Sequence, residues 1–151
     1  MNYTLLGKIW RRMPGRARWR LIRMSQPTFT VSAGAVVLNR DDEVLLLDHI
    51  LRLGSGWGIP GGFLDRGEQP EMAIRRELME ETGIGLRDVR LLKAHTVYRH
   101  IEFLYAARSD DEPRMLSPEI TGLGWFGPGK LPEGLPTPHA NIIKAVWRGE
   151  I

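Results

Sequence analysis

The chain has 151 residues, 42% of them hydrophobic, so it is long enough for one domain with a real core and too short for two ordinary ones. It contains no cysteine, which excludes disulfides, thiolate zinc sites and a cysteine nucleophile. The net charge of +3 conceals a segregation: residues 1–40 carry eight basic and no acidic side chains, whereas residues 41–151 carry 13 basic and 18 acidic ones, a net charge of −5.

Sequence features of membrane or secreted proteins are missing. No apolar run approaches the roughly 18 residues that a membrane-spanning helix requires. The basic N-terminus has no continuous apolar block followed by a small-residue cleavage site, as a secretory signal would have. An arginine-rich, acid-free start also fits a transit peptide, but nothing else indicates an organelle. We therefore expect a cytoplasmic protein.

The first 27 residues form a basic segment with helical periodicity. Apolar residues recur at helical spacing over residues 5–13, Pro14-Gly15 interrupts the pattern, and residues 16–24 resume it. These runs predict two short amphipathic helices in a basic arm, residues 1–27, preceding a domain at 28–151. The apolar face favours packing on the arm's own domain or homodimerisation, with an anionic membrane or RNA as alternatives.

A sheet is expected to begin after the arm. Residues 29–38 and 44–48 are rich in β-branched and apolar side chains and are separated by a polar turn, which predicts a hairpin. The glycine-rich stretch 54–62 lacks the Lys-Ser/Thr of a P-loop and the strand-to-helix context of a dinucleotide fingerprint. It is interpreted as a flexible loop.

A helix is expected over residues 70–81, because Pro70 suits its first position and Gly83 suits its end. Thr137-Pro138 resembles the start of another helix. The remaining predicted elements are strands at 89–97, 101–108 and 122–126 and a helix through residue 147.

The helix at 70–81 carries the residues most indicative of chemistry. Glu77, Glu80 and Glu81 occupy positions i, i+3 and i+4, so they share one face. Carboxylates held close together repel one another, and a hard divalent cation such as Mg²⁺ relieves that repulsion. The simpler interpretation, a solvated acidic side chain, suits Glu71. Three residues are predicted to pack inward from the opposite face: Ala73, Ile74 and Leu78.

Residues 62–84 resemble the Nudix box. That motif reads glycine, five residues, glutamate, seven residues, then Arg-Glu-aliphatic-any-Glu-Glu-any-Gly-aliphatic, and this chain fills every specified position. The flanks are also similar, with Trp57-Gly-Ile-Pro-Gly before the box and Glu119 to Phe126 after it. The resemblance extends over most of residues 28–147.

The resemblance implies an α/β fold, namely an α/β/α sandwich around a mixed sheet. It implies that Glu77, Glu80 and Glu81 bind Mg²⁺ or Mn²⁺, with the Gly61 carbonyl as a further ligand. The implied reaction is hydrolysis of a diphosphate bond in a nucleoside diphosphate linked to another group, such as a nucleotide sugar, ADP-ribose, a nucleoside triphosphate or a dinucleoside polyphosphate. The alternatives are action on RNA ends and a catalytically silent nucleotide-sensing or partner-binding module, although such modules commonly lose box carboxylates. The resemblance also implies an Arg76–Glu68 pair that supports the box, whose other structural positions are Gly62 and Gly83.

Candidates outside the box are less specific. Carboxylates bound to a metal have their lone pairs engaged, so a separate general base is expected, and Glu119 is the candidate. Its rivals are Asp110, Asp111, Glu112 and, within the box, Glu77.

Aromatic and histidine side chains are the remaining candidates. Trp57 and Tyr98 are candidate substrate contacts, but Trp57 is equally well explained as a buried aromatic. Three histidines on separate predicted elements are interpreted as structural or surface residues: His95, His100 and His139.

Overall fold

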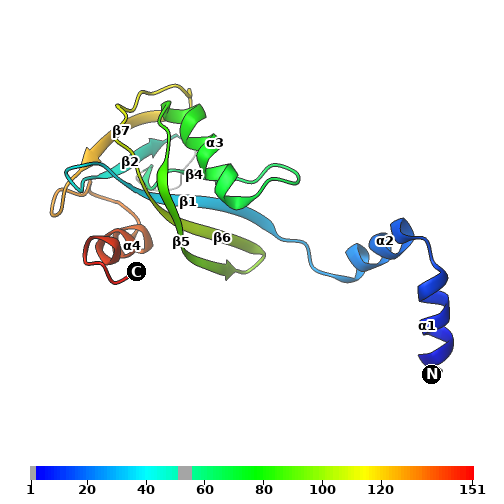
Figure 1. The fold of residues 1–151 in the computed structure, drawn as a ribbon. Helices are drawn as coiled ribbons and strands as arrows, with labels where there is room; N and C mark the ends of the chain where they lie inside the picture. The colour runs from blue at the N-terminus through cyan, green and yellow to red at the C-terminus, as the bar shows by residue number, and fades with distance from the viewer. Residues whose placement is uncertain (1–2, 51–55) are drawn as a thin grey trace.

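The computed structural model describes residues 3–50 and 56–151, which form a sheet with one helix on each face and two helices at the N-terminus (Figure 1). The elements in chain order are α1 Tyr3–Arg12, α2 Gly15–Ser25, β1 Thr30–Leu38, β2 Val44–His49, β3 Trp57–Gly58, β4 Gly61–Phe63, α3 Pro70–Thr82, β5 Arg87–Val97, β6 His100–Arg108, β7 Ile120–Phe126 and α4 Thr137–Trp147.

The seven-stranded sheet is mixed. Its main path runs β3-β2-β1-β6-β5, while β4 pairs with β1 and β7 pairs with β2. The pair β1–β6 is parallel and the other pairs are antiparallel. β1 therefore lies inside the sheet, which agrees with the burial of its apolar residues from Ala33 to Leu38.

The two faces of the sheet bury two separate cores. Alternate residues of the strands point to opposite faces, so Leu45 and Leu47 pack with Ile74 and Leu78 of α3. Leu46 and Val44 instead pack with Ile143 of α4. The expected α/β/α sandwich around a mixed sheet is confirmed, as is the expected β1–β2 hairpin.

The helix that carries the three glutamates begins and ends as its sequence predicts. Pro70 occupies its first turn, and Gly83 adopts a left-handed φ of 73° and donates its N–H to Met79 O at 3.0 Å. The residues predicted to pack inward are all fully buried: Ala73, Ile74 and Leu78.

The glycine-rich stretch differs from the expected flexible loop. From Gly56 onward it holds two short strands, β3 and β4, and Gly54 lies outside the described residues. Gly61 explains the pairing of β4 with β1, because a Cβ at this position would lie 2.5 Å from Ala33 O. Only glycine permits so close an approach of two backbones, and strand propensity does not report that.

The N-terminal helices α1 and α2 stand away from the sheet, joined to β1 by residues 26–29 (Figure 1). α2 contains no buried residue. No helix within the described residues is long and apolar enough to cross a membrane. The division into an arm at 1–27 and a domain at 28–151 stays a prediction.

Candidate catalytic site

A cavity of about 500 Å³ opens beside β4 and the acidic face of α3. Its walls come from β2, β4, α3 and the segment before β7. The residues that line it are His49, Gly61, Gly62, Phe63, Asp65, Arg76, Glu77, Glu81 and Glu119.

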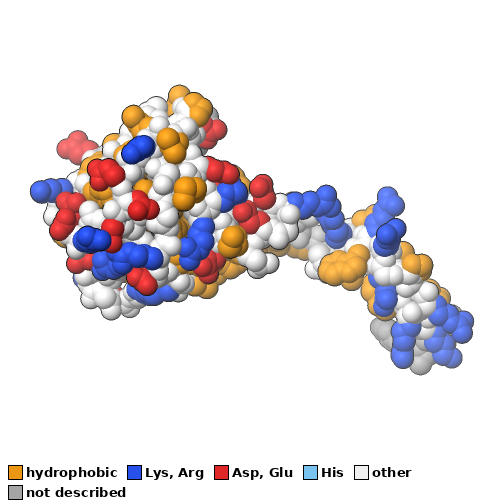
Figure 2. Space-filling model, turned by 45° about the horizontal axis from the view of Figure 1, so that its top comes forward, with side chains coloured by type: hydrophobic (Ala, Val, Ile, Leu, Met, Phe, Trp, Pro, Cys, Tyr) orange, Lys and Arg blue, Asp and Glu red, His pale blue; other side chains and the backbone are white. Residues whose placement is uncertain are grey.

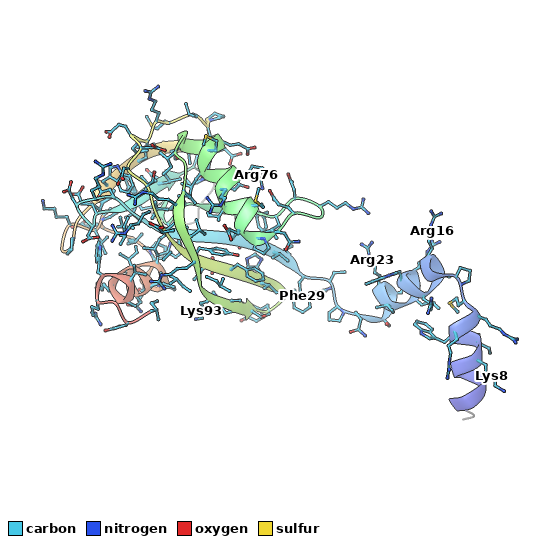
Figure 3. The ribbon with its side chains drawn as sticks, viewed as in Figure 1. Lys8, Arg16, Arg23, Phe29, Arg76 and Lys93 are labelled. Atoms are coloured by element: carbon cyan, nitrogen blue, oxygen red, sulfur yellow. The ribbon has the colours of Figure 1, made fainter. Side chains whose placement is uncertain are left out.

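Arg76 is one of the side chains that line this cavity, and it belongs to α3 (Figure 3). Its guanidinium makes a bidentate contact with Glu68, with Nε–Oε1 at 2.9 Å and Nη2–Oε2 at 3.0 Å. The hydrogen bonds from Arg76 hold the pKa of Glu68 below its usual value, and Glu68 in turn raises the pKa of Arg76. Arg76 also donates to Phe63 O at 3.1 Å, so it ties the end of β4 and, through Glu68, the loop after it to α3.

The same guanidinium reaches the carboxylates of the box. Its Nη1 donates to Glu77 Oε1 at 2.9 Å and to Glu80 Oε2 at 3.2 Å. Glu77 points inward and lies against Gly62, where a Cβ would come within 2.3 Å of its carboxyl carbon. The absent side chain of Gly62 is therefore what makes room for the Glu77 carboxylate.

A histidine that the sequence analysis did not single out, His49, lies between Glu81 and Glu119. Nε2 of His49 lies 2.9 Å from Glu81 Oε1, and its Nδ1 lies 4.0 Å from Glu119 Oε2. A signal was present in the sequence. His49 follows Leu45 and Leu47 at the strand period of two, on the sheet face that α3 covers.

The structure brings most, but not all, of the expected ligands to the cavity. Glu77 and Glu81 line it together with Gly61, whereas the Glu80 side chain is 61% exposed and bonds only at the rim. Within residues 3–50 and 56–151, no three histidine or acidic side chains converge closely enough to hold a metal ion.

The charges of the lining nevertheless fit a divalent cation. The cavity carries four carboxylates, from Asp65, Glu77, Glu81 and Glu119, and one guanidinium. Hard cations such as Mg²⁺ prefer oxygen ligands of this kind, and one Arg76 does not neutralise four acids.

Of the rivals of Glu119, Glu77 lines the same cavity, whereas Asp110, Asp111 and Glu112 lie elsewhere. Asp110 forms ion pairs with Arg40 and Arg87, and Asp111 accepts a hydrogen bond from the Gly85 N–H at 2.8 Å. Asp110, Asp111 and Glu112 line a separate cavity of about 240 Å³. None of Asp110, Asp111 and Glu112 lines the cavity of the box, as Glu119 does.

The two aromatic candidates do not line this cavity. Trp57 packs edge-on against Phe126 with ring centroids 5.2 Å apart, next to the core under α4. Tyr98 sits in the turn between β5 and β6 with a φ of 53° and is 96% exposed. Neither contributes to the walls formed by β4 and α3.

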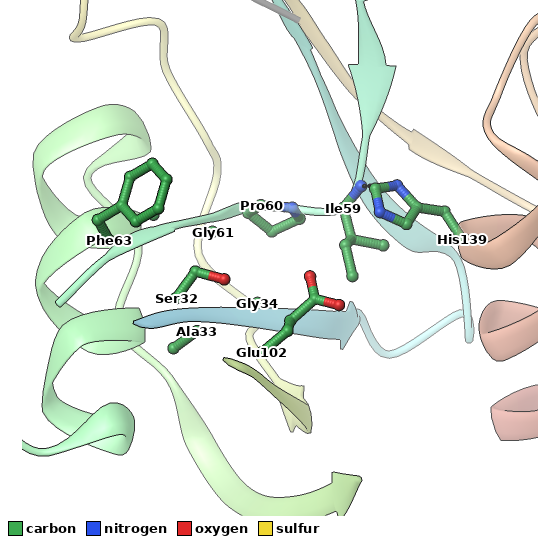
Figure 4. Close-up of a pocket in the computed structure, with 10 residues that line it drawn as sticks. Ser32, Ala33, Gly34, Ile59, Pro60, Gly61, Phe63, Glu102 and His139 are labelled. Atoms are coloured by element: carbon green, nitrogen blue, oxygen red, sulfur yellow. Dashed lines mark hydrogen bonds between the residues drawn. The ribbon is translucent and has the colours of Figure 1, made fainter. Parts of the chain in front are cut away.

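A second cavity, of about 220 Å³, adjoins the first along β4 (Figure 4). Gly61, Gly62 and Phe63 border both cavities. The Glu102 carboxylate enters from β6 and the His139 ring from α4 (Figure 4).

His95 and His100, which were predicted to be structural or surface residues, have contacts with neighbouring side chains. Nε2 of His95 lies 3.5 Å from Glu102 Oε2. The ring of His100 bridges Thr30 Oγ1 at 2.8 Å and Ser32 Oγ at 2.9 Å.

The fold and the box define an α/β/α sandwich protein whose acidic helix borders a cleft. The NUDIX domain model matches residues 28–146, so the chain belongs to the Nudix hydrolase family. Its sequence is 29% identical over 119 residues to the MutT-like protein of Streptomyces ambofaciens, covering 77% of this chain and 75% of that one. It is also 29% identical over 105 residues to the NAD-capped RNA hydrolase NudC of Vibrio parahaemolyticus, covering 68% of this chain but only 40% of that relative.

A solved structure gives the same assignment. The crystal structure of the MutT NUDIX hydrolase from Burkholderia pseudomallei superposes with a TM-score of 0.68 at 33% identity. The match covers 80% of this chain and 98% of that one. The N-terminal segment before residue 28 lies outside the family match.

Proposed function

We propose that this protein hydrolyses a diphosphate bond in a nucleoside diphosphate linked to another group, with Mg²⁺ or Mn²⁺ as its cofactor. The observation that carries the proposal is the excess of carboxylates over cationic groups around a cavity bordered by Gly61 and Gly62. The names of the relatives, which include a MutT hydrolase and an NAD-capped RNA hydrolase, support phosphate-bond chemistry on nucleotides.

Glu77, Glu80 and Glu81 would hold the cation, with the Gly61 carbonyl as a further ligand. When bound, a divalent cation neutralises phosphate charge and lowers the pKa of a water molecule. Glu80 lies at the rim in the structure, so its contribution requires a rotation of its exposed side chain toward the cavity.

Three further residues have proposed roles in positioning the ligands and in proton transfer. Arg76 holds Glu77 and the loop after β4 in place through the contacts described above. His49 orients Glu81 through the 2.9 Å contact. Glu119, at the cavity wall and 53% exposed, is the proposed general base because it is not one of the proposed metal ligands.

The second cavity is proposed to hold the group attached to the diphosphate. It shares the β4 glycines with the first cavity, so one extended substrate reaches both. The Glu102 carboxylate accepts hydrogen bonds and the His139 ring donates or accepts them, which suits a polar group with N–H or O–H donors.

The proposal is tested by a substrate panel with Mg²⁺ that includes ADP-ribose, nucleoside triphosphates, nucleotide sugars, dinucleoside polyphosphates and an RNA with a 5′-triphosphate. We expect turnover of at least one compound, abolished by chelation of the metal. Glu80→Gln or Glu81→Gln should lower kcat by about 10²-fold or more, because each removes a charged ligand. Glu71→Gln is the matched control on the same helix, because Glu71 is exposed and pairs with Arg75.

The alternative, a catalytically silent module, makes a different prediction for the same panel. Such a protein would bind one of the nucleotides, as measured by calorimetry, with no phosphate-bond cleavage at any metal concentration. If the Glu81→Gln variant hydrolysed the substrate at the wild-type rate, the assignment of Glu81 as a metal ligand would be wrong, although the hydrolase function would stand.

A further inference from the structure

The N-terminal arm, defined as residues 3–25, carries a charge that the catalytic site does not use. It contains one lysine and six arginines and no acidic residue. Figure 2 shows these basic side chains spread over the arm, whereas the body presents both signs of charge. Lys8, Arg16 and Arg23 extend outward from the two helices (Figure 3).

The arm also exposes large apolar side chains beside these charges. In α1, Ile9 and Trp10 fall on one helical face by their spacing, and Lys8, Arg11 and Arg12 fall on the other. In α2, Met24 is 78% exposed and Trp19 is 67% exposed. The other exposed large apolar residues of the described arm are Ile9, Trp10, Leu21 and Ile22.

Within the described residues of the body, exposed large apolar side chains gather at one place, where Phe29, Val97 and Tyr98 border one cavity. Others lie on separate elements, such as Phe63 on β4, Met72 on α3 and Leu91 on β5. Figure 1 shows both arm helices apart from the sheet and from α3 and α4. The apolar face of the arm is therefore unpartnered within the described chain.

We propose that the arm binds the surface of an anionic lipid bilayer. A helix with apolar and tryptophan side chains on one face and arginines on the other suits the boundary between headgroups and acyl chains. The phosphates of anionic lipids complement the seven basic side chains, and the acyl region accepts the apolar face. RNA would satisfy the charges alone. A second copy of the arm would cover the apolar face but leave the basic side chains of both copies without counter-charges.

The charge of the body does not oppose this binding strongly. Residues 41–151 have a net charge of −5, which an anionic surface repels. The linker of residues 26–29 spans roughly 14 Å when extended, at about 3.5 Å per residue. That separation exceeds the Debye length of about 8 Å at physiological salt, so the repulsion is largely screened while the arm stays in contact.

The test uses the full chain and vesicle co-sedimentation at about 0.1 M salt. Vesicles of phosphatidylcholine and phosphatidylglycerol in equal parts are compared with vesicles of phosphatidylcholine alone. We expect the protein to pellet with the anionic vesicles and to stay in the supernatant with the neutral ones. Turnover in solution is measured separately, so failure of the proposed hydrolase activity leaves this test intact.

Paired variants separate the two components of binding. The double variant Arg11→Gln with Arg12→Gln should weaken partitioning by about 25-fold, since each basic side chain near an anionic bilayer contributes about fivefold. The double variant Ile9→Ser with Trp10→Ser keeps the charge and should still weaken it by about tenfold or more. The matched control, Leu91→Ser with Lys93→Gln on exposed positions of β5, should bind within about twofold of wild type.

Four outcomes would overturn the proposal. They are no pelleting with anionic vesicles, equal pelleting with neutral ones, undiminished binding by the Ile9 and Trp10 variant, and pelleting that the control variant loses equally. Binding to a single-stranded RNA oligonucleotide, or an arm-dependent dimer in sedimentation velocity, would identify the true partner if it occurred without vesicle binding.

Discussion

Glu119 reaches the cavity from the segment before β7, separately from the glutamates of α3. Its backbone is fixed on both sides, since its N–H donates to Ser117 Oγ at 3.2 Å and its carbonyl accepts from the Ile50 N–H at 2.9 Å. A fixed backbone keeps the carboxylate beside His49 without burying it. This combination suits a group that exchanges a proton with water.

We expect Glu119→Gln to lower kcat by about 10²- to 10⁴-fold at saturating Mg²⁺, the usual contribution of a general base. Glu112→Gln, in the separate cavity beside Asp110, serves as the control and should leave kcat unchanged. A loss below about threefold for Glu119→Gln would move the role to Glu77.

The Glu68–Arg76 pair stabilises the folded chain in a pH-dependent way. The pKa of Glu68 is lowered in the folded protein from an ordinary value of 4.5, mainly by the hydrogen bonds from Arg76. A lowered folded pKa means that the stabilisation is present above pH 4.5 and is lost as the pH falls through the folded value. Glu68→Gln should therefore lower Tm at neutral pH, and the difference from wild type should shrink in acid.

Thermal unfolding followed by circular dichroism, at neutral pH and at a pH below the folded pKa of Glu68, measures this difference in Tm. Glu133→Gln, at an exposed loop position, is the control and should match wild type at each pH. A Tm difference for Glu68→Gln that stayed constant from neutral pH to below the folded pKa would show that packing, and not the charge pair, accounts for it.

Gly61 and Gly62 are adjacent in β4 but face different elements: Gly61 faces the backbone of β1, and Gly62 faces the Glu77 side chain of α3. A Cβ on Gly61 would meet backbone, Ala33 O at 2.5 Å and the Gly34 Cα at 2.8 Å. A Cβ on Gly62 would meet the Glu77 carboxyl, the mobile end of a side chain. The first clash strains the sheet, and the second displaces a proposed metal ligand.

Gly61→Ala should therefore destabilise the fold by about 1 to 3 kcal/mol, as overpacking does. Gly62→Ala should unfold near the wild-type temperature yet lose about 10²-fold in kcat, the order of loss that follows from misplacing a reacting group. Gly127→Ala, whose added Cβ meets only Glu43 at 3.8 Å or beyond, is the control for both measurements. Equal Tm losses for Gly61→Ala and Gly62→Ala would contradict the distinction.

At the scale of the whole molecule, the arm and the catalytic cavity are separate in charge and in space. The residues lining the cavity come from β2 onward, and none belongs to α1 or α2. Deleting residues 1–24 should change solubility or self-association, as the exposed apolar side chains of the arm predict.

The same deletion should leave kcat/KM for a soluble substrate within about twofold of wild type. Steady-state kinetics and sedimentation velocity on the shortened chain test both statements. A large loss of turnover with an unchanged sedimentation profile would show that the arm contributes to the site after all.

Elements with local signals were predictable from the amino-acid sequence. The spacing of Glu77, Glu80 and Glu81 and the punctuation by Pro70 and Gly83 were sufficient to predict α3 with its buried face, because helical periodicity depends only on neighbours along the chain. The β1–β2 hairpin followed in the same way from two apolar runs around a polar turn.

Tertiary structure alone decided the parallel pairing of β1 with β6 and the two short strands after Gly56. It also decided that His49 lies between Glu81 and Glu119 and that Tyr98 stands outside the cavity. These features depend on which segments distant in sequence approach one another. That choice is made by the burial of two cores on opposite faces of one sheet, which no local pattern encodes.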